Sequence, residues 1–107
     1  MVPAAEGKVK IKRDKNNNYV ISLKVIRLAQ PERLQPPKDH YVVWMETDQN
    51  GTKNIGKLES KSGFLSKTLK GTLVTVTPFK PIRFFITAED NATVQYPSGP
   101  MVLSTKP

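Results

Sequence analysis

The segment from Gly51 to Lys57 (Gly-Thr-Lys-Asn-Ile-Gly-Lys) falls one residue short of a phosphate-binding loop of the form G-x-x-x-x-G-K-[ST]. That loop ends in a hydroxyl that helps to hold Mg²⁺, and it is followed by a helix whose first amides bind phosphate. Leu58 has no hydroxyl, and the residues after it are strand-like. We therefore interpret the segment as a hairpin turn followed by a strand.

A second pattern, Asp14-x-Asn16-x-Asn18, copies the first three ligand positions of a calcium-binding helical-hand loop. The positions that should follow do not fit. Tyr19 stands where the loop needs glycine, and Val25 stands where it needs a bidentate glutamate. Because Asp and Asn bond their own backbone in tight turns, we interpret the run as the tip of a hairpin.

The chain has few residues that could support other catalytic reactions or bind a metal. The chain has no cysteine and one histidine, His40, which excludes thiolate nucleophiles, disulfides and blue-copper sites. A Ser-His-Asp hydrolase would depend on His40, and no G-x-S-x-G nucleophile elbow is present. Carboxylates for acid–base catalysis could come from Glu46, Glu59 or Glu89, but the sequence does not show that any two converge. We predict a protein that is not an enzyme and has no cofactor or metal. A small enzyme with a carboxylate pair at Glu46 or Glu89 is kept as the third hypothesis.

The elements that must carry these residues are strands. Val, Ile and Thr are frequent, Ala is scarce, and 9 prolines and 6 glycines divide the chain into short pieces. Apolar residues alternate with polar ones, and Asn50-Gly51 is a strong hairpin signal. A crossing loop is expected over 29–39, with one helical turn at 31–34. The predicted strands are residues 7–13, 18–28, 40–47, 53–59, 63–69, 72–77, 82–89 and 100–104.

This spacing predicts an all-β fold, an antiparallel immunoglobulin-like β-sandwich of about seven or eight strands. A chain of 107 residues forms one domain, which we place at 7–104, with a flexible leader at 1–6 and a tail at 105–107. Trp44 is expected to anchor the core between the two sheets. The predicted structural core residues are Tyr41, Val43, Trp44 and Ile86.

The chain is strongly basic, with a formal net charge of +8 and a pI near 9.9. Positive charge gathers in residues 1–27 and 53–83. The first interpretation of the lysines in the first stretch is a solvated strand face, where they also prevent edge-to-edge aggregation. The alternative is that this stretch contacts an anionic partner, an unidentified protein or an envelope component. The predicted contact residues are Lys8, Lys10, Lys12, Arg13 and Lys15. The alternative is a small basic nucleic-acid-binding β-barrel, which we rank second because few aromatic residues are free to stack on bases.

With its strands placed, the chain from about 40 to 104 resembles the C-terminal domain of the anti-sigma-K factor family, and residues 7–28 are similar to that family's opening strand pair. The stretches that carry the resemblance are Tyr41-Val-Val-Trp44, Gly51, Ile55-Gly-Lys-Leu58, Ile86-Thr-Ala-Glu89 and Pro97-Ser-Gly-Pro-Met-Val-Leu103. The chain departs from the family where Asp90-Asn91-Ala92 replaces paired glycines.

The resemblance implies an immunoglobulin-like sandwich outside the cytoplasmic membrane of a bacterium, acting as a binding or sensing module. It transfers no catalytic residue, and no sigma-factor binding, because nothing here matches the family's cytoplasmic half. The location is therefore expected to be periplasmic or at the cell surface. The first residues, Met-Val-Pro-Ala-Ala-Glu, do not form a signal peptide. We expect that a targeting segment was trimmed from the natural chain. That segment could also tether the protein to the membrane.

Overall fold

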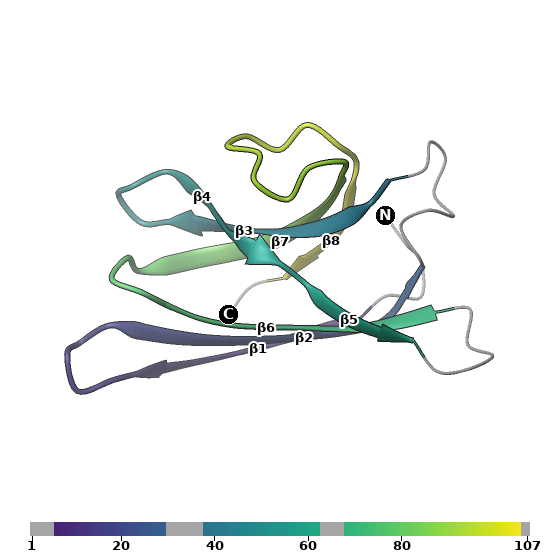
Figure 1. The fold of residues 1–107 in the computed structure, drawn as a ribbon. Coiled ribbons are helices and arrows are strands. Elements are labelled where there is room, and N and C mark those ends of the chain that lie inside the picture. Colours follow the sequence, from purple (N-terminus) through teal and green to yellow (C-terminus); the bar gives the residue numbers. More distant parts are fainter. Residues whose placement is uncertain (1–5, 30–37, 63–67, 106–107) are drawn as a thin grey trace.

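The described residues of the computed structural model, which are 6–29, 38–62 and 68–105, form eight antiparallel strands and no helix. Figure 1 shows them as two layers packed face to face. The strands are β1 (Glu6–Arg13), β2 (Tyr19–Ala29), β3 (His40–Thr47), β4 (Thr52–Lys57), β5 (Glu59–Ser62), β6 (Thr68–Thr77), β7 (Pro81–Glu89) and β8 (Met101–Thr105).

The two sheets have the strand orders β1-β2-β6-β5 and β4-β3-β7-β8. This is the immunoglobulin-type arrangement, in which the first, second, sixth and fifth strands take the places of strands A, B, E and D. The other sheet supplies the C, F and G positions with β3, β7 and β8, and β4 is added beside β3. The predicted all-β sandwich is therefore confirmed.

The chain changes sheets at Leu58, between β4 and β5, and this crossing is visible as the diagonal strand in Figure 1. The amide of Leu58 still donates to the carbonyl of Tyr41 in the β3 sheet, at 2.9 Å. Its buried side chain packs on Gly71 of β6, where an added Cβ would lie 3.0 Å from Leu58 Cδ1. The crossing strand thus approaches β6 closely because residue 71 has no side chain.

The core between the sheets is built from alternate residues of β2, β3 and β7, as expected for strands with one face toward a facing sheet. Its members share near-complete burial and form two adjoining clusters. They include Ile21, Leu23, Val25, Tyr41, Val43, Met45, Phe84, Ile86 and Ala88. Tyr41, Val43 and Ile86 therefore lie where the sequence places them.

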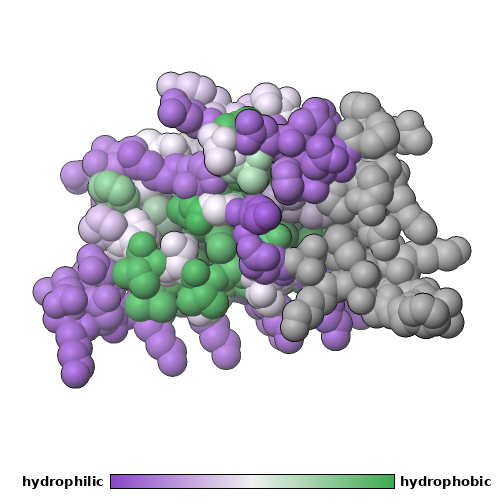
Figure 2. Space-filling view, viewed as in Figure 1, coloured by the Kyte–Doolittle hydropathy of each residue, from purple (hydrophilic) through white to green (hydrophobic). Residues whose placement is uncertain are grey.

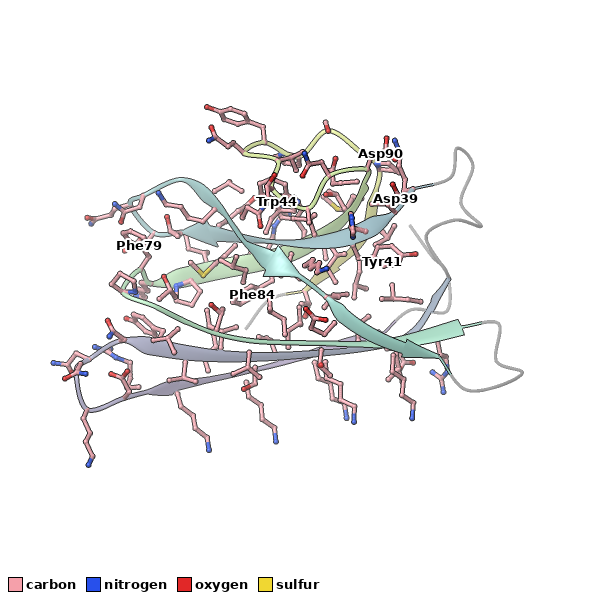
Figure 3. All side chains as sticks on the ribbon, in the orientation of Figure 1. Asp39, Tyr41, Trp44, Phe79, Phe84 and Asp90 are labelled. Atoms are coloured by element: carbon pink, nitrogen blue, oxygen red, sulfur yellow. The ribbon has the colours of Figure 1, made fainter. Side chains whose placement is uncertain are left out.

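Trp44 is fully buried but does not lie between the sheets, so this part of the prediction is wrong. It belongs to the opposite face of β3 from Tyr41 and Val43, because successive side chains of a strand alternate between faces. There it packs with Val42, Phe85 and Val94, under the segment 90–100 that joins β7 to β8. Figure 3 shows Trp44 on the far side of β3 from Phe84, which lies between the sheets.

Most predicted strands are found, with shifted ends. The expected strand 53–59 is divided at Leu58, β1 begins at Glu6, and β8 extends to Thr105. The expected strand 63–69 and the helical turn at 31–34 fall largely or wholly outside the described residues. Gly51 lies in the predicted turn between β3 and β4 and has a φ of +76°, a conformation that glycine adopts without steric cost.

Candidate functional site

The outer face of the β1-β2-β6-β5 sheet presents a group of exposed lysines, which we call the lysine face. Along β1, exposed and half-buried residues alternate, which puts Lys8, Lys10 and Lys12 on the solvent side. The strand register adds one lysine from β2 and one from β6. Lys24 of β2 lies opposite Lys8. Thr72 of β6 lies opposite Lys24, and Lys70, two residues before Thr72, lies on the same outward face. The lysine face comprises Lys8, Lys10, Lys12, Lys24 and Lys70. Figure 3 shows long basic side chains projecting from this sheet, away from the rest of the molecule.

Two features distinguish this face from an ordinary solvated surface. Lys8 and Lys24 are direct partners across β1 and β2, and together with Glu6 they line a small depression of about 140 Å³. Two carboxylates lie on the same face: Glu6, whose Oε1 is 3.2 Å from Arg27 Nη1, and Glu59 of β5, which lies opposite Thr72 of β6. None of the five lysines forms an ion pair with another described residue.

Arg13 and Lys15, the two remaining predicted contact residues, do not belong to the lysine face. The guanidinium of Arg13 lies 4.4 Å from the centre of the Tyr19 ring and donates to the Asn17 carbonyl at 3.1 Å. Lys15 is exposed at the tip of the β1–β2 hairpin. The sequence does not predict Lys24 and Lys70 as members of this face, because their positions relative to the β1 lysines depend on the register of β1, β2 and β6. The alternation within β2 is the one signal of that register in the sequence.

The hairpin tip uses Asp14 as a structural residue. Its Oδ1 accepts hydrogen bonds from the amides of Asn16 at 2.8 Å and Asn18 at 2.9 Å. Asn17 adopts a φ of +62°, which asparagine tolerates better than most residues. The Asn-rich run is therefore a turn, as interpreted. Among the described residues, no group of three or more His, Asp and Glu side chains could hold a metal ion.

On the other sheet, a buried hydrogen-bond network joins the segment 90–100 to β7. Glu89 is 2% exposed, and its carboxylate accepts from Thr87 Oγ1 at 2.6 Å. Ser98 donates twice, from Oγ at 2.7 Å and from its amide at 3.1 Å, and the Gly99 amide donates at 3.0 Å. Burial raises the pKa of Glu89, but these four hydrogen bonds to the charged form outweigh it and leave the pKa below its ordinary value of 4.5.

The three candidate carboxylates do not form a catalytic pair. Glu46 is bound to Arg83 at 2.9 Å, and Glu59 lies in the other sheet. In the register of β3 and β7, Glu46 faces Arg83 and His40 faces Glu89. Six residues of strand separate these two positions, which is about 20 Å. The Ser98 hydroxyl donates to Glu89, and among the described residues no hydrogen bond joins Ser98 to His40.

A shallow groove of about 640 Å³ lies between β4 and residues 92–95. Its central polar group is the amide of Asn54, whose Nδ2 donates to the carbonyls of Ala92 at 3.0 Å and Val94 at 2.8 Å. The side-chain oxygen accepts from the Gly56 amide at 2.9 Å. Asn54 thus serves to hold the 90–100 segment over β3, and its polar atoms are engaged within the chain.

Comparison with known proteins gives no family assignment: no protein-family model, curated protein or solved structure matches the chain. The resemblance to the anti-sigma-K domain therefore stays a prediction based on the sequence. No helix long and apolar enough to cross a membrane occurs in the part of the chain that the structure describes.

Proposed function

We propose that this protein is a non-enzymatic binding module that holds an anionic partner on its lysine face. The pairing of Lys8 with Lys24 is the observation that carries the proposal. Like charges directly opposite each other destabilise an antiparallel strand pair. Folding alone gains nothing from this arrangement, whereas an anionic partner lying over both ammonium groups would remove the repulsion.

The spacing of the lysine face suits an extended polyanion. Successive outward residues of a strand are about 6.7 Å apart, and neighbouring strands are about 4.8 Å apart. A partner with regularly spaced negative groups can therefore contact several lysines at once. Stacking on nucleic-acid bases requires exposed aromatic rings. Among the described residues, Tyr96 is the one large exposed aromatic side chain, and it lies in the 90–100 segment of the other sheet.

The resemblance to the anti-sigma-K family supports a location outside the cytoplasmic membrane of a bacterium, where the partner would be an anionic protein or envelope component. A membrane tether would be supplied by a segment beyond the printed sequence. Reading the complete gene tests this part of the proposal. A signal peptide or lipidation signal upstream is expected, and a full gene without one would overturn the location.

Binding of fluorescent poly-L-glutamate tests the proposed site. Substituting Lys8, Lys10 and Lys12 together by glutamine is expected to weaken binding by roughly ten- to a hundredfold, given the contribution of single lysines near anionic surfaces. The matched control replaces three lysines away from the face, Lys53→Gln, Lys57→Gln and Lys80→Gln, so that net charge falls equally. Equal loss in both variants would show that net charge alone attracts the polymer, and would overturn the proposed site.

A further inference from the structure

One strand of the lysine-bearing sheet has an edge that is only partly covered. β6 pairs with β2 along its length, but it pairs with β5 only over Leu69–Thr72. Beyond Thr72 no described strand pairs with that side of β6: β4 lies in the other sheet (Figure 1), and it approaches β6 at Gly56, where an added Cβ would lie 3.3 Å from Leu73 Cδ1. We call Leu73–Thr77 the free edge of β6.

The backbone groups that are unpaired at this edge follow from the alternation of hydrogen bonds along antiparallel strands. In the β1–β2 hairpin, the Asp14 amide donates to the Asn18 carbonyl at 3.0 Å. The even-numbered residues of β2 therefore bond to β1, and its odd-numbered residues bond to β6. Because odd residues of β2 face odd residues of β6, the amides and carbonyls of Val74 and Val76 point away from β2, toward the free edge.

The free edge lacks the charged residues, prolines and bulges by which proteins usually protect exposed strands. Such features include lysines along the strand, proline, bulges and very short strands. β1 carries lysines, β4 contains a bulge at Gly56 with a φ of +130°, and β8 has 5 residues after Pro100. Between Thr72 and Thr77, in contrast, β6 has no charged residue and no proline, and Val74 and Val76 are 69% and 54% exposed.

The surroundings of the free edge differ on its two sides. Toward the space between the sheets lie Ile55, Leu73 and Phe79, which are only partly buried. Figure 2 shows hydrophobic side chains gathered over this part of β6, with hydrophilic ones projecting below them. On the outer side lie the exposed side chains of Val74 and Val76 themselves. Lys24, which faces Thr72, and Lys70, two residues before Thr72, lie on this outer face at one end of the free edge. An added strand would thus meet apolar side chains on its inner face, and two exposed valines flanked by lysines on its outer face.

We propose that the free edge of β6 binds an extended acidic polypeptide segment as an additional strand, with apolar residues facing inward and acidic residues alternating outward. Backbone hydrogen bonds to Val74 and Val76 would give affinity, as in other cases of strand addition. A second copy of this chain suits the edge poorly because each copy carries a charge of +8. The inference rests on the proposed function only for the sign of the partner's charge.

The test uses a capped eight-residue peptide of alternating glutamate and valine, with amide hydrogen exchange measured by NMR. Saturating peptide is expected to slow exchange at the Val74 and Val76 amides by at least about tenfold, because these N–H groups become hydrogen-bonded. The same peptide with every backbone amide methylated keeps its side chains but cannot donate, and we expect it to bind at least about tenfold more weakly.

A protein variant tests the same edge from the other side. Val74→Pro removes an N–H that is not bonded to β2, so β6 should still pair with β2. The variant should, however, no longer bind the peptide. Val74→Thr retains the N–H and is the matched control, expected to bind normally. The methylated peptide gives an answer even if Val74→Pro does not fold.

Three results would overturn the inference, and each is distinct from failure of the proposed function. If both peptides bind equally and the Lys8, Lys10 and Lys12 variant loses both, the lysine face binds anions but β6 adds no strand. If poly-L-glutamate binds and the alternating peptide does not, strand addition is wrong. If Val74 and Val76 become protected as protein concentration rises without peptide, the occupant is a second copy.

Discussion

The indole Nε1 of Trp44 donates a hydrogen bond of 2.7 Å to Thr87 Oγ1, and both residues lie on the outer face of their sheet. Thr87 in turn donates a hydrogen bond to Glu89, whose carboxylate also accepts hydrogen bonds from the Ser98 and Gly99 amides. This chain of contacts links the single tryptophan to the segment 90–100. The sandwich therefore has a second buried layer, outside the core that the two sheets enclose.

Removing the indole N–H should weaken this layer. Trp44→Phe is expected to lower the free energy of unfolding by about 1–3 kcal/mol, since a buried acceptor loses its donor and some volume is lost. Trp44→Ala should cost about 3–5 kcal/mol. Urea unfolding measures both.

A double-mutant cycle with Thr87→Val separates the hydrogen bond from the lost volume. A coupling of at least about 0.5 kcal/mol between Trp44→Phe and Thr87→Val is expected for residues in one network. Strictly additive effects would contradict the proposed link.

The ionisation of Glu89 should make stability depend on pH in the acid range. Because hydrogen bonds lower its pKa in the folded protein, the carboxylate favours folding. That contribution is complete above the ordinary value of 4.5 and is lost as pH falls through the lower pKa of the folded state. We expect Glu89→Gln to be less stable by about 1–3 kcal/mol at pH 7, and the difference to shrink on acidification. A difference that stays constant from pH 7 to pH 3 would exclude this role of Glu89.

Gly99 is expected to tolerate no side chain. A Cβ at this position would collide with the backbone carbonyl oxygen of Ala88, which cannot move without disturbing β7. Gly99→Ala should therefore displace the 90–100 segment and destabilise the protein by about 1–3 kcal/mol. The emission of Trp44 should shift to longer wavelength as its cover lifts. Gln95→Ala, at an exposed position of the same segment, is the control and should change stability by less than about 0.5 kcal/mol.

Stability and binding should respond in opposite directions at Lys24. Lys24→Glu replaces a like-charge pair with an opposite-charge pair across β1 and β2, which should stabilise the fold by about 0.2–1 kcal/mol at low salt. The same change should weaken binding of poly-L-glutamate severalfold. Thermal unfolding and binding assays at matched salt measure the two effects. A variant that is less stable than the parent would show that Lys8 and Lys24 do not repel each other.

The strands and turns of the two sheets can be predicted from the sequence, whereas the arrangement of residues on the two outer faces cannot. Alternation in residues 7–28 predicts the β1–β2 hairpin, and Asn50-Gly51 predicts the β3–β4 turn. The run from Tyr41 to Met45 is apolar at every position, so periodicity does not tell which side of β3 Trp44 occupies. The segment 90–100, which covers Trp44, is mostly polar and is typical of a surface loop. From this segment, Val94 is the partly buried hydrophobic residue that packs against Trp44 and its buried neighbours.

The candidate site shows the same limit. Lys8, Lys10 and Lys12 are predicted from period-2 spacing within one strand. Lys24 and Lys70 join them through cross-strand register, which depends on the hairpin turn and on the bulge of β2 between Val25 and Leu28. Arg13 continues the charge run in sequence, yet it alternates away from the lysine face and binds Tyr19. Register therefore determines which of the basic residues act together.

NMR shift mapping of poly-L-glutamate on the unmodified protein tests whether the lysine face binds anions, because it shows where a polyanion binds. We expect amide shifts to change along Lys8–Lys12 and around Ser22, Lys24 and Lys70, and these changes to fade as salt screens the charges. Residues of β7, β8 and the 90–100 segment should stay unchanged. Shift changes centred on those residues, or spread evenly over all exposed lysines, would contradict a binding function of the lysine face.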